Sequence, residues 1–209
     1  MRQRWNGPLV VAVLVAVLGL WAPGPTTLTV DEPLWLFRSQ KFAEAIGRGD
    51  FDRATARQFR APATMPGVTT MAAGSGGRMI AEVGDRLGVS GVVADNWVRS
   101  PQVLRAARAI VTLAVAGLAA LIVALLASLV GRRAATAGGL LVAVEPFLVG
   151  HAGVLHTDAL LTALCVASLL ALASAAWGVP GAGLAWSRRG LVVASGVLAG
   201  LAGLTKVSA

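Results

Sequence analysis

Three long apolar segments without a charged residue constrain the fold of this 209-residue chain more than any other feature. They cover residues 5–30, 109–131 and 159–186, and each is long enough to cross a hydrocarbon core of roughly 30 Å. The chain is 56% hydrophobic and only 13% charged, which is typical of polytopic membrane proteins. Because backbone polar groups in lipid need partners within the protein, we predict an all-α membrane fold.

The apolar pattern predicts about five transmembrane helices in a domain that covers residues 1–209. We place these helices at residues 8–23, 109–131, 134–150, 159–178 and 190–205, with one long loop at residues 24–108. Glu145 interrupts the third segment and the fifth segment is short, so both need neighbouring helices around them. A signal peptide is the alternative interpretation of residues 1–22, although no clean small-x-small cleavage site follows Trp21.

The chain carries 18 Lys and Arg against 10 Asp and Glu. In so apolar a chain we attribute this excess to membrane topology and expect no nucleic-acid partner. Basic pairs flank the predicted spans at Arg2 and Arg4, Arg132 and Arg133, and Arg188 and Arg189. The positive-inside rule then predicts a multi-pass protein of the cell membrane, with a cytoplasmic N-terminus and an external loop 24–108. The lone Cys165 lies in the fourth span, so no intrachain disulfide orders that loop.

The external loop contains one clear amphipathic pattern. Apolar residues at 34–37, Phe42 and Ile46 predict a helix that lies in the membrane interface, or alternatively a small soluble helix packed on the loop. Residues 61–70 indicate an extended turn, and the glycine-rich residues 74–77 indicate a flexible break. That break lacks the lysine and the spacing of a phosphate-binding loop, so we assign it no nucleotide.

Asp31 and Glu32 form a carboxylate pair where the first span emerges into water. A carboxylate at this depth can accept a proton or bind a metal ion, and it can still reach a head group held in the bilayer. The alternative is a structural role, in which Asp31 caps a helix opened by Pro33.

Further polar residues cluster in the predicted outer turn between the third and fourth spans, namely His151, His156 and Asp158, with Glu145 shortly before them. Their spacing matches no standard zinc pattern, so we favour a structural or substrate-contacting role and assign no metal ligand. A divalent cation is left open as a cofactor. Glu145 is costly inside a span unless it faces protein, water or a cation.

Several motifs together resemble a known family. They are Val30-Asp31-Glu32-Pro33, Pro66-Gly67-Val68-Thr69-Thr70-Met71, Glu145-Pro146-Phe147-Leu148, Leu155-His156-Thr157-Asp158 and Gly203-Leu204-Thr205-Lys206. In this order they resemble the protein O-mannosyltransferases, and more closely the bacterial phospholipid-carrier-dependent glycosyltransferases of the GT-C fold. The chain departs from the family at Glu145, where relatives often have Asp, and at Met65, where many have His. Family members also continue well beyond the position of Lys206, so we expect an N-terminal part that is inactive alone.

The resemblance implies a hexosyltransferase that uses a polyprenyl-phosphate sugar, with mannose the best-known case. The enzyme would transfer one sugar to a hydroxyl of a protein or glycan acceptor at the outer face, among membrane lipids. It implies Asp31 as the catalytic base, with Arg108 and Lys206 beside the lipid phosphate. Glu32 would orient the acceptor, assist the base or only cap the helix. His156, Asp158 and Glu145 would contact substrate.

Two alternatives remain beside this interpretation. Arg105, Arg108 and Lys206 lie at predicted outer helix ends, where basic side chains commonly snorkel to lipid head groups, and for Arg105 we favour that role. A membrane transporter or a noncatalytic assembly subunit is the rival function, in which Glu145, His156 and Asp158 would line a polar path.

Overall fold

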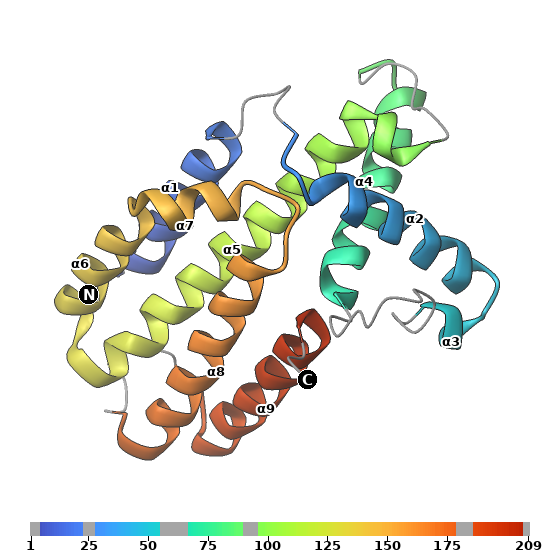
Figure 1. Ribbon diagram of the computed structural model, residues 1–209. Helices are drawn as coiled ribbons and strands as arrows, with labels where there is room; N and C mark the ends of the chain where they lie inside the picture. Colours follow the sequence, from blue (N-terminus) through green and yellow to red (C-terminus); the bar gives the residue numbers. More distant parts are fainter. Residues whose placement is uncertain (1–4, 23–27, 55–66, 90–95, 179–185, 207–209) are drawn as a thin grey trace.

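The computed structural model describes residues 5–22, 28–54, 67–89, 96–178 and 186–206, and within these ranges all regular structure is helical (Figure 1). Helix α5 (Pro101–Val130) is the central element. Helices α1 (Gly7–Trp21), α6 (Arg132–Ala143) and α7 (Pro146–Ala152) lie on one side of it, and α8 (Asp158–Trp177) and α9 (Arg188–Thr205) lie on the other. The all-α prediction is confirmed for the described residues.

Two of the described helices, α5 and α8, are long and apolar enough to cross a membrane, and the bent pair α6 and α7 makes a third if it counts as one span. Helix α1 is apolar but has only 15 residues. Helix α9 begins with Arg188 and Arg189 and does not meet the same criteria. The described part of the chain is therefore α-helical with two or three candidate spans, and the five-span arrangement stays a prediction.

The predicted third span is broken at Glu145. Helices α6 and α7 meet there at an angle of 71°. The Glu145 carboxylate is the N-cap of α7, where it accepts hydrogen bonds from the backbone N–H groups of Phe147 at 3.1 Å and Leu148 at 2.7 Å. Pro146 follows at the first helical position, where a missing N–H costs nothing. The sequence 134–150 therefore forms two helices instead of one straight span.

A second group of helices lies beside the N-terminal half of α5. It comprises α2 (Glu32–Gly47), the short α3 (Phe51–Ala54), α4 (Val68–Arg86) and the 3-10 turn η2 (Trp97–Arg99). Trp35 and Leu36 of α2 point into the core, whereas Leu34, Phe37 and Ile46 are exposed. The predicted amphipathic helix is present, and its depth relative to a bilayer stays a prediction.

Glycine allows α4 to pack closely on its neighbours. A Cβ at Gly77 would lie 2.6 Å from the backbone N of Ala107 in α5, and a Cβ at Gly74 would collide with Ser39 of α2. The prediction of a flexible break at residues 74–77 was wrong, because these glycines are the contact surface of a continuous helix. Residues 68–70 also belong to this helix, and the preceding residues 61–66 lie outside the described part of the chain.

Helix α5 begins earlier than the apolar pattern predicted. It starts at Pro101, so Arg105 and Arg108 lie within the helix and not in the loop that was predicted to end at residue 108. Val103, Ala107, Val111 and Val115 form the buried stripe that continues into the apolar half. Helix α5 therefore connects the group of α2, α3, α4 and η2 with the other candidate spans.

Candidate functional site

Glu32 forms a fully buried ion pair with Arg108. The Nε and Nη2 atoms of Arg108 donate hydrogen bonds of 2.7 and 2.6 Å to the two carboxylate oxygens, and both residues are nearly inaccessible to solvent. The backbone N–H groups of Thr29 and Leu155 donate two more, at 2.9 and 3.0 Å. Burial alone would raise the pKa of Glu32, but these four hydrogen bonds and the Arg108 charge lower it below its ordinary value. Glu32 is therefore a charged structural anchor.

Asp31, the neighbouring residue, points elsewhere. It occupies the N-cap position of α2, yet its side chain makes no capping hydrogen bond. Its carboxylate is 60% exposed, and its Oδ2 lies 3.4 Å from Nε2 of His156. The capping role considered for Asp31 is therefore absent, and the carboxylate is open to a ligand on one side.

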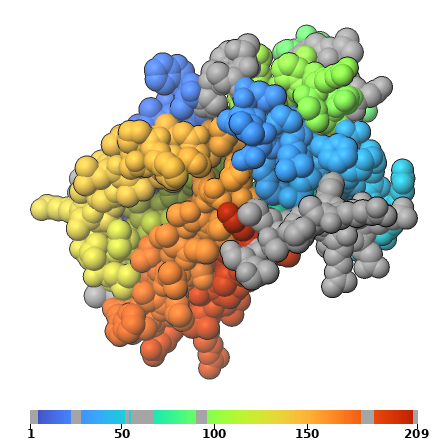
Figure 2. Space-filling view, viewed as in Figure 1, coloured from blue at the N-terminus to red at the C-terminus, as the bar shows by residue number. Residues whose placement is uncertain are grey.

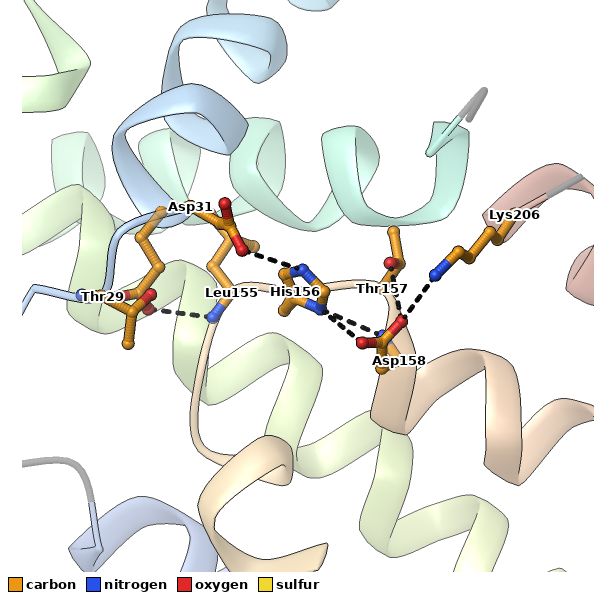
Figure 3. A network of polar contacts seen from close by, with 8 residues as sticks. Thr29, Asp31, Leu155, His156, Thr157, Asp158 and Lys206 are labelled. Carbon is orange, nitrogen blue, oxygen red and sulfur yellow. Dashed lines mark hydrogen bonds and ion pairs between the residues drawn. The ribbon is translucent and has the colours of Figure 1, made fainter. Parts of the chain in front are cut away.

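His156 connects Asp31 to a second carboxylate, as Figure 3 shows. Its Nδ1 lies 3.3 Å from Oδ2 of Asp158 and accepts a long hydrogen bond, 3.4 Å, from the Asp158 backbone N–H. Each ring nitrogen of His156 thus faces a carboxylate oxygen, Nε2 that of Asp31 and Nδ1 that of Asp158. Lys206 completes the series with a 3.1 Å hydrogen bond from Nζ to Oδ1 of Asp158. Elements far apart in sequence thus bring together Asp31, His156, Asp158 and Lys206.

Trp35 supports the His156 ring. The two rings meet edge to face, with centroids 6.2 Å apart and an interplanar angle of 90°. Trp35 itself is buried between Arg38, whose guanidinium lies 4.5 Å from the indole centroid, and Gly67. Gly67 has a φ of +60°, and a Cβ there would lie 2.3 Å from the indole. The imidazole orientation is therefore determined by packing as well as by its carboxylate neighbours.

Asp31, His156 and Asp158 line a cavity of about 450 Å³. Its other walls come from Thr29 and from α7 and the turn after it, at Pro146, Phe147, Gly150, His151 and Val154. Figure 2 shows this face of the molecule, where the blue surface of α2 adjoins the gold and orange surfaces of α7 and α8. The cavity combines two carboxylates and two imidazoles with an exposed aromatic ring, Phe147. Such a lining suits a polar ligand that also presents an apolar face.

Glu145 and His151 lie apart from the carboxylate series. The Glu145 carboxylate caps α7 and lines a neighbouring cavity, and His151 Nδ1 lies 2.9 Å from the carbonyl oxygen of Phe147. Within the described ranges, no group of three or more His, Cys, Asp or Glu side chains is placed to hold a metal ion.

The surroundings of Arg108 and Arg105 differ from those predicted from the sequence. Arg108, predicted beside a lipid phosphate, has its guanidinium directed to Glu32. Arg105, predicted only to snorkel, is exposed and lines a separate cavity between α1 and α5. Sequence reasoning missed the contribution of Trp35 and the backbone donors of Thr29 and Leu155. Backbone donors leave no signal in a sequence. Gly67 belongs to one of the motifs that carry the family resemblance, but the sequence does not show that it lies against Trp35.

The comparisons with known proteins add no relative. The chain matches no family model, no curated protein sequence and no solved structure.

Proposed function

We propose that this protein is a lipid-carrier-dependent glycosyltransferase of the GT-C type. It would move a single sugar, most simply mannose, from a polyprenyl phosphate to an acceptor hydroxyl at the outer face of the cell membrane. Asp31 would be the catalytic base. The proposal is supported by the resemblance of the sequence motifs and by the position of Asp31 in a polar cavity beside apolar helices.

The observation that carries this proposal is the divergence of two adjacent carboxylates. Glu32 is buried, charged and fully paired, so it has no capacity left to accept a substrate proton. Asp31 is exposed to the cavity and has one imidazole beside it. Glu32 therefore has a structural role, and Asp31 is available for chemistry. This arrangement is expected when a catalytic base must be held at a fixed depth.

In the proposed reaction, Asp31 takes the proton of the acceptor hydroxyl while the acceptor oxygen attacks the anomeric carbon. The bond between that carbon and the phosphate oxygen breaks, and the lipid phosphate leaves with the electron pair. The imidazole of His156, with Nε2 3.4 Å from Oδ2 of Asp31, orients the Asp31 carboxylate. Lys206 offers positive charge for the leaving phosphate, and Asp158 holds its ammonium group. We assign Arg108 to the support of Glu32 and not to the phosphate.

The test is sugar transfer from a polyprenyl-phosphate mannose in membranes that contain the natural full-length protein. We expect Asp31→Asn to lower kcat by at least about 100-fold, because amide nitrogen cannot accept the proton, with little change in folding. Glu44→Gln is the matched control: Glu44 is also a carboxylate of α2, but it pairs with Lys41 away from the cavity. Unchanged turnover in the Asp31→Asn protein would remove Asp31 from the reaction.

A specific observation also favours a second candidate function, a transporter. The break between α6 and α7 places irregular backbone and Glu145 within a candidate span, a feature common at transporter substrate sites. Uptake of a labelled solute into proteoliposomes, abolished by Glu145→Gln, would support this candidate. Sugar transfer that persists in the Glu145→Gln protein and fails in the Asp31→Asn protein would support the enzyme.

A further inference from the structure

A second cavity lies between α1 and α5, and its lining differs in charge from the cavity of Asp31. Its volume is about 380 Å³, and it is lined by Gly19, Leu20, Trp21, Arg105, Arg108, Ala109 and Thr112. The lining contains two arginines and no carboxylate. The cavity of Asp31, in contrast, is lined by two carboxylates and by no lysine or arginine. The lining of the cavity between α1 and α5 therefore suits an anionic group.

In the cavity between α1 and α5, Arg105 is the arginine whose guanidinium is available to bind a ligand. Arg108 is 5% exposed and directs Nε and Nη2 to Glu32. Arg105 is exposed, three positions earlier on the same helix, and its side chain has no hydrogen bond or ion pair among the described residues. A guanidinium presents its donors in a planar fork that matches phosphate oxygens.

The remaining lining suits a membrane lipid better than a soluble anion. Trp21 ends α1 and is 81% exposed, and Leu20 and Ala109 add apolar surface directly beside Arg105. Tryptophan is enriched at the level of the lipid head groups, and basic pockets between membrane helices bind anionic head groups. Gly19 packs against Thr112, where a Cβ would lie 2.8 Å from Cγ2, so α1 and α5 hold the floor of this cavity closely together.

We infer that Arg105 and Trp21 form a binding site for the phosphate group of a membrane lipid, separate from the cavity of Asp31. The guanidinium of Arg105 would bind the phosphate, and Trp21 with Leu20 would contact the start of the hydrocarbon chain. This inference does not depend on the proposed glycosyl transfer. It gives Arg105 a specific ligand where the sequence indicated only snorkelling.

The test is native mass spectrometry of the protein released from detergent micelles with phosphatidylglycerol, with zwitterionic phosphatidylcholine or with inorganic phosphate. We expect one saturable phosphatidylglycerol per chain, and no comparable retention of the other two. Arg105→Gln should weaken that retention roughly tenfold. Arg188→Gln is the matched control, since Arg188 is also an exposed arginine in the first turns of a helix, and it should retain the lipid fully.

Two further measurements keep the inference testable if Arg105→Gln folds poorly. Ala109→Trp fills the cavity without removing a charge, and it should lower phosphatidylglycerol retention to a similar extent. Farnesyl phosphate should compete with phosphatidylglycerol in the wild-type protein, because the shared ligand group is a phosphate on an apolar chain. Equal losses in the Arg105→Gln and Arg188→Gln proteins, unaltered retention in the Ala109→Trp protein, or equal binding of inorganic phosphate would each overturn the assignment. Loss of transfer activity alone, with lipid retention intact, would count against the proposed function and not against this site.

Discussion

Arg108 of α5 holds the carboxylate of Glu32 at the start of α2 through two hydrogen bonds, although 76 positions separate the two residues. This pair fixes the start of α2 on the N-terminal half of the central helix. The Leu155 N–H reaches the same carboxylate, so the turn that precedes α8 is fixed with it. Asp31 and His156, the neighbours of Glu32 and Leu155 in sequence, are thereby brought face to face.

Loss of either partner of the Glu32–Arg108 pair should destabilise the fold strongly. Glu32→Gln leaves a buried guanidinium without its counter-charge, and Arg108→Gln leaves a buried carboxylate, so we expect a loss of about 3–5 kcal/mol in the free energy of unfolding. Asp31→Asn, one position away but exposed, should change it by less than about 0.5 kcal/mol. Denaturant unfolding in detergent, followed by circular dichroism, measures all three. Equal stability of the Glu32→Gln and Asp31→Asn proteins would contradict the structural role of Glu32.

The same pair predicts how stability depends on pH. The pKa of Glu32 is lower in the folded protein than its ordinary value of 4.5, so the unfolded chain binds more protons in the acid range. The stabilisation is therefore fully present above about pH 4.5, and it is lost as the pH falls through the lowered pKa. Thermal unfolding at pH values from about 7 down to about 3 should show this loss in the wild-type protein and a weaker one in the Glu32→Gln protein.

The salt dependence of the acid-induced loss of stability distinguishes the contribution of Glu32 from that of surface carboxylates. Glu44 also has a lowered pKa, through its hydrogen bond with Lys41, but that pair is exposed and screened by salt. A high salt concentration should therefore remove the contribution of Glu44 and leave that of Glu32. An acid transition of Tm that vanishes in high salt would contradict the assignment to the buried pair.

The sequence reveals the class of the fold and the positions of the apolar helices, because hydropathy and length are local properties. It does not reveal where α5 begins, since Arg105 and Arg108 look like a polar flank until the partner of Arg108 is known. The sequence does not reveal the break at Glu145 for a similar reason. A charged residue followed by Pro146 fits either an interruption tolerated within a span or the N-cap of a new helix. The glycines at residues 74–77 look flexible in the sequence because their use depends on the partner helices.

The candidate site, like the fold, could be predicted only in part from the sequence. Motif resemblance selected Asp31, His156, Asp158 and Lys206, and the structure places these four in one series of contacts. The motif resemblance could not distinguish the role of Asp31 from that of Glu32. That distinction depends on Arg108 and on the backbone N–H groups of Thr29 and Leu155.

The packing of α4 on α5 predicts a position-specific cost of a methyl group. Gly77→Ala should destabilise the protein by about 1–3 kcal/mol, because the new Cβ would meet the backbone of Ala107. Gly117→Ala is the matched control, since Gly117 is also helical but has no atom within 4 Å of its Cβ position. Thermal unfolding of the two variants compares them directly. A loss of the same size at Gly117 would show that helical glycine itself, and not the contact, determines the effect.

The support of His156 predicts an effect on activity from a residue outside the cavity. Gly67→Ala adds a Cβ that would collide with Trp35, which in turn contacts the His156 ring. We expect roughly a tenfold or greater loss of transfer, because the imidazole would turn away from Asp31. Gly49→Ala is the control that distinguishes backbone strain from the collision with Trp35. Gly49 also has a positive φ, of +71°, but there is open space around its Cβ position. Similar losses of activity in both proteins would contradict a role for the Trp35 contact.

The proposed role of Asp31 is that of the outward-facing base of a sugar-transfer site. It is tested most directly by the labelling rate of Asp31→Cys with a membrane-impermeant thiol reagent in intact cells, in a Cys165→Ala background. We predict rapid labelling from outside, and clear slowing when the protein, reconstituted in vesicles in the same orientation, is given polyprenyl-phosphate mannose. Labelling only after permeabilisation, or a rate that the donor leaves unchanged, would contradict the account.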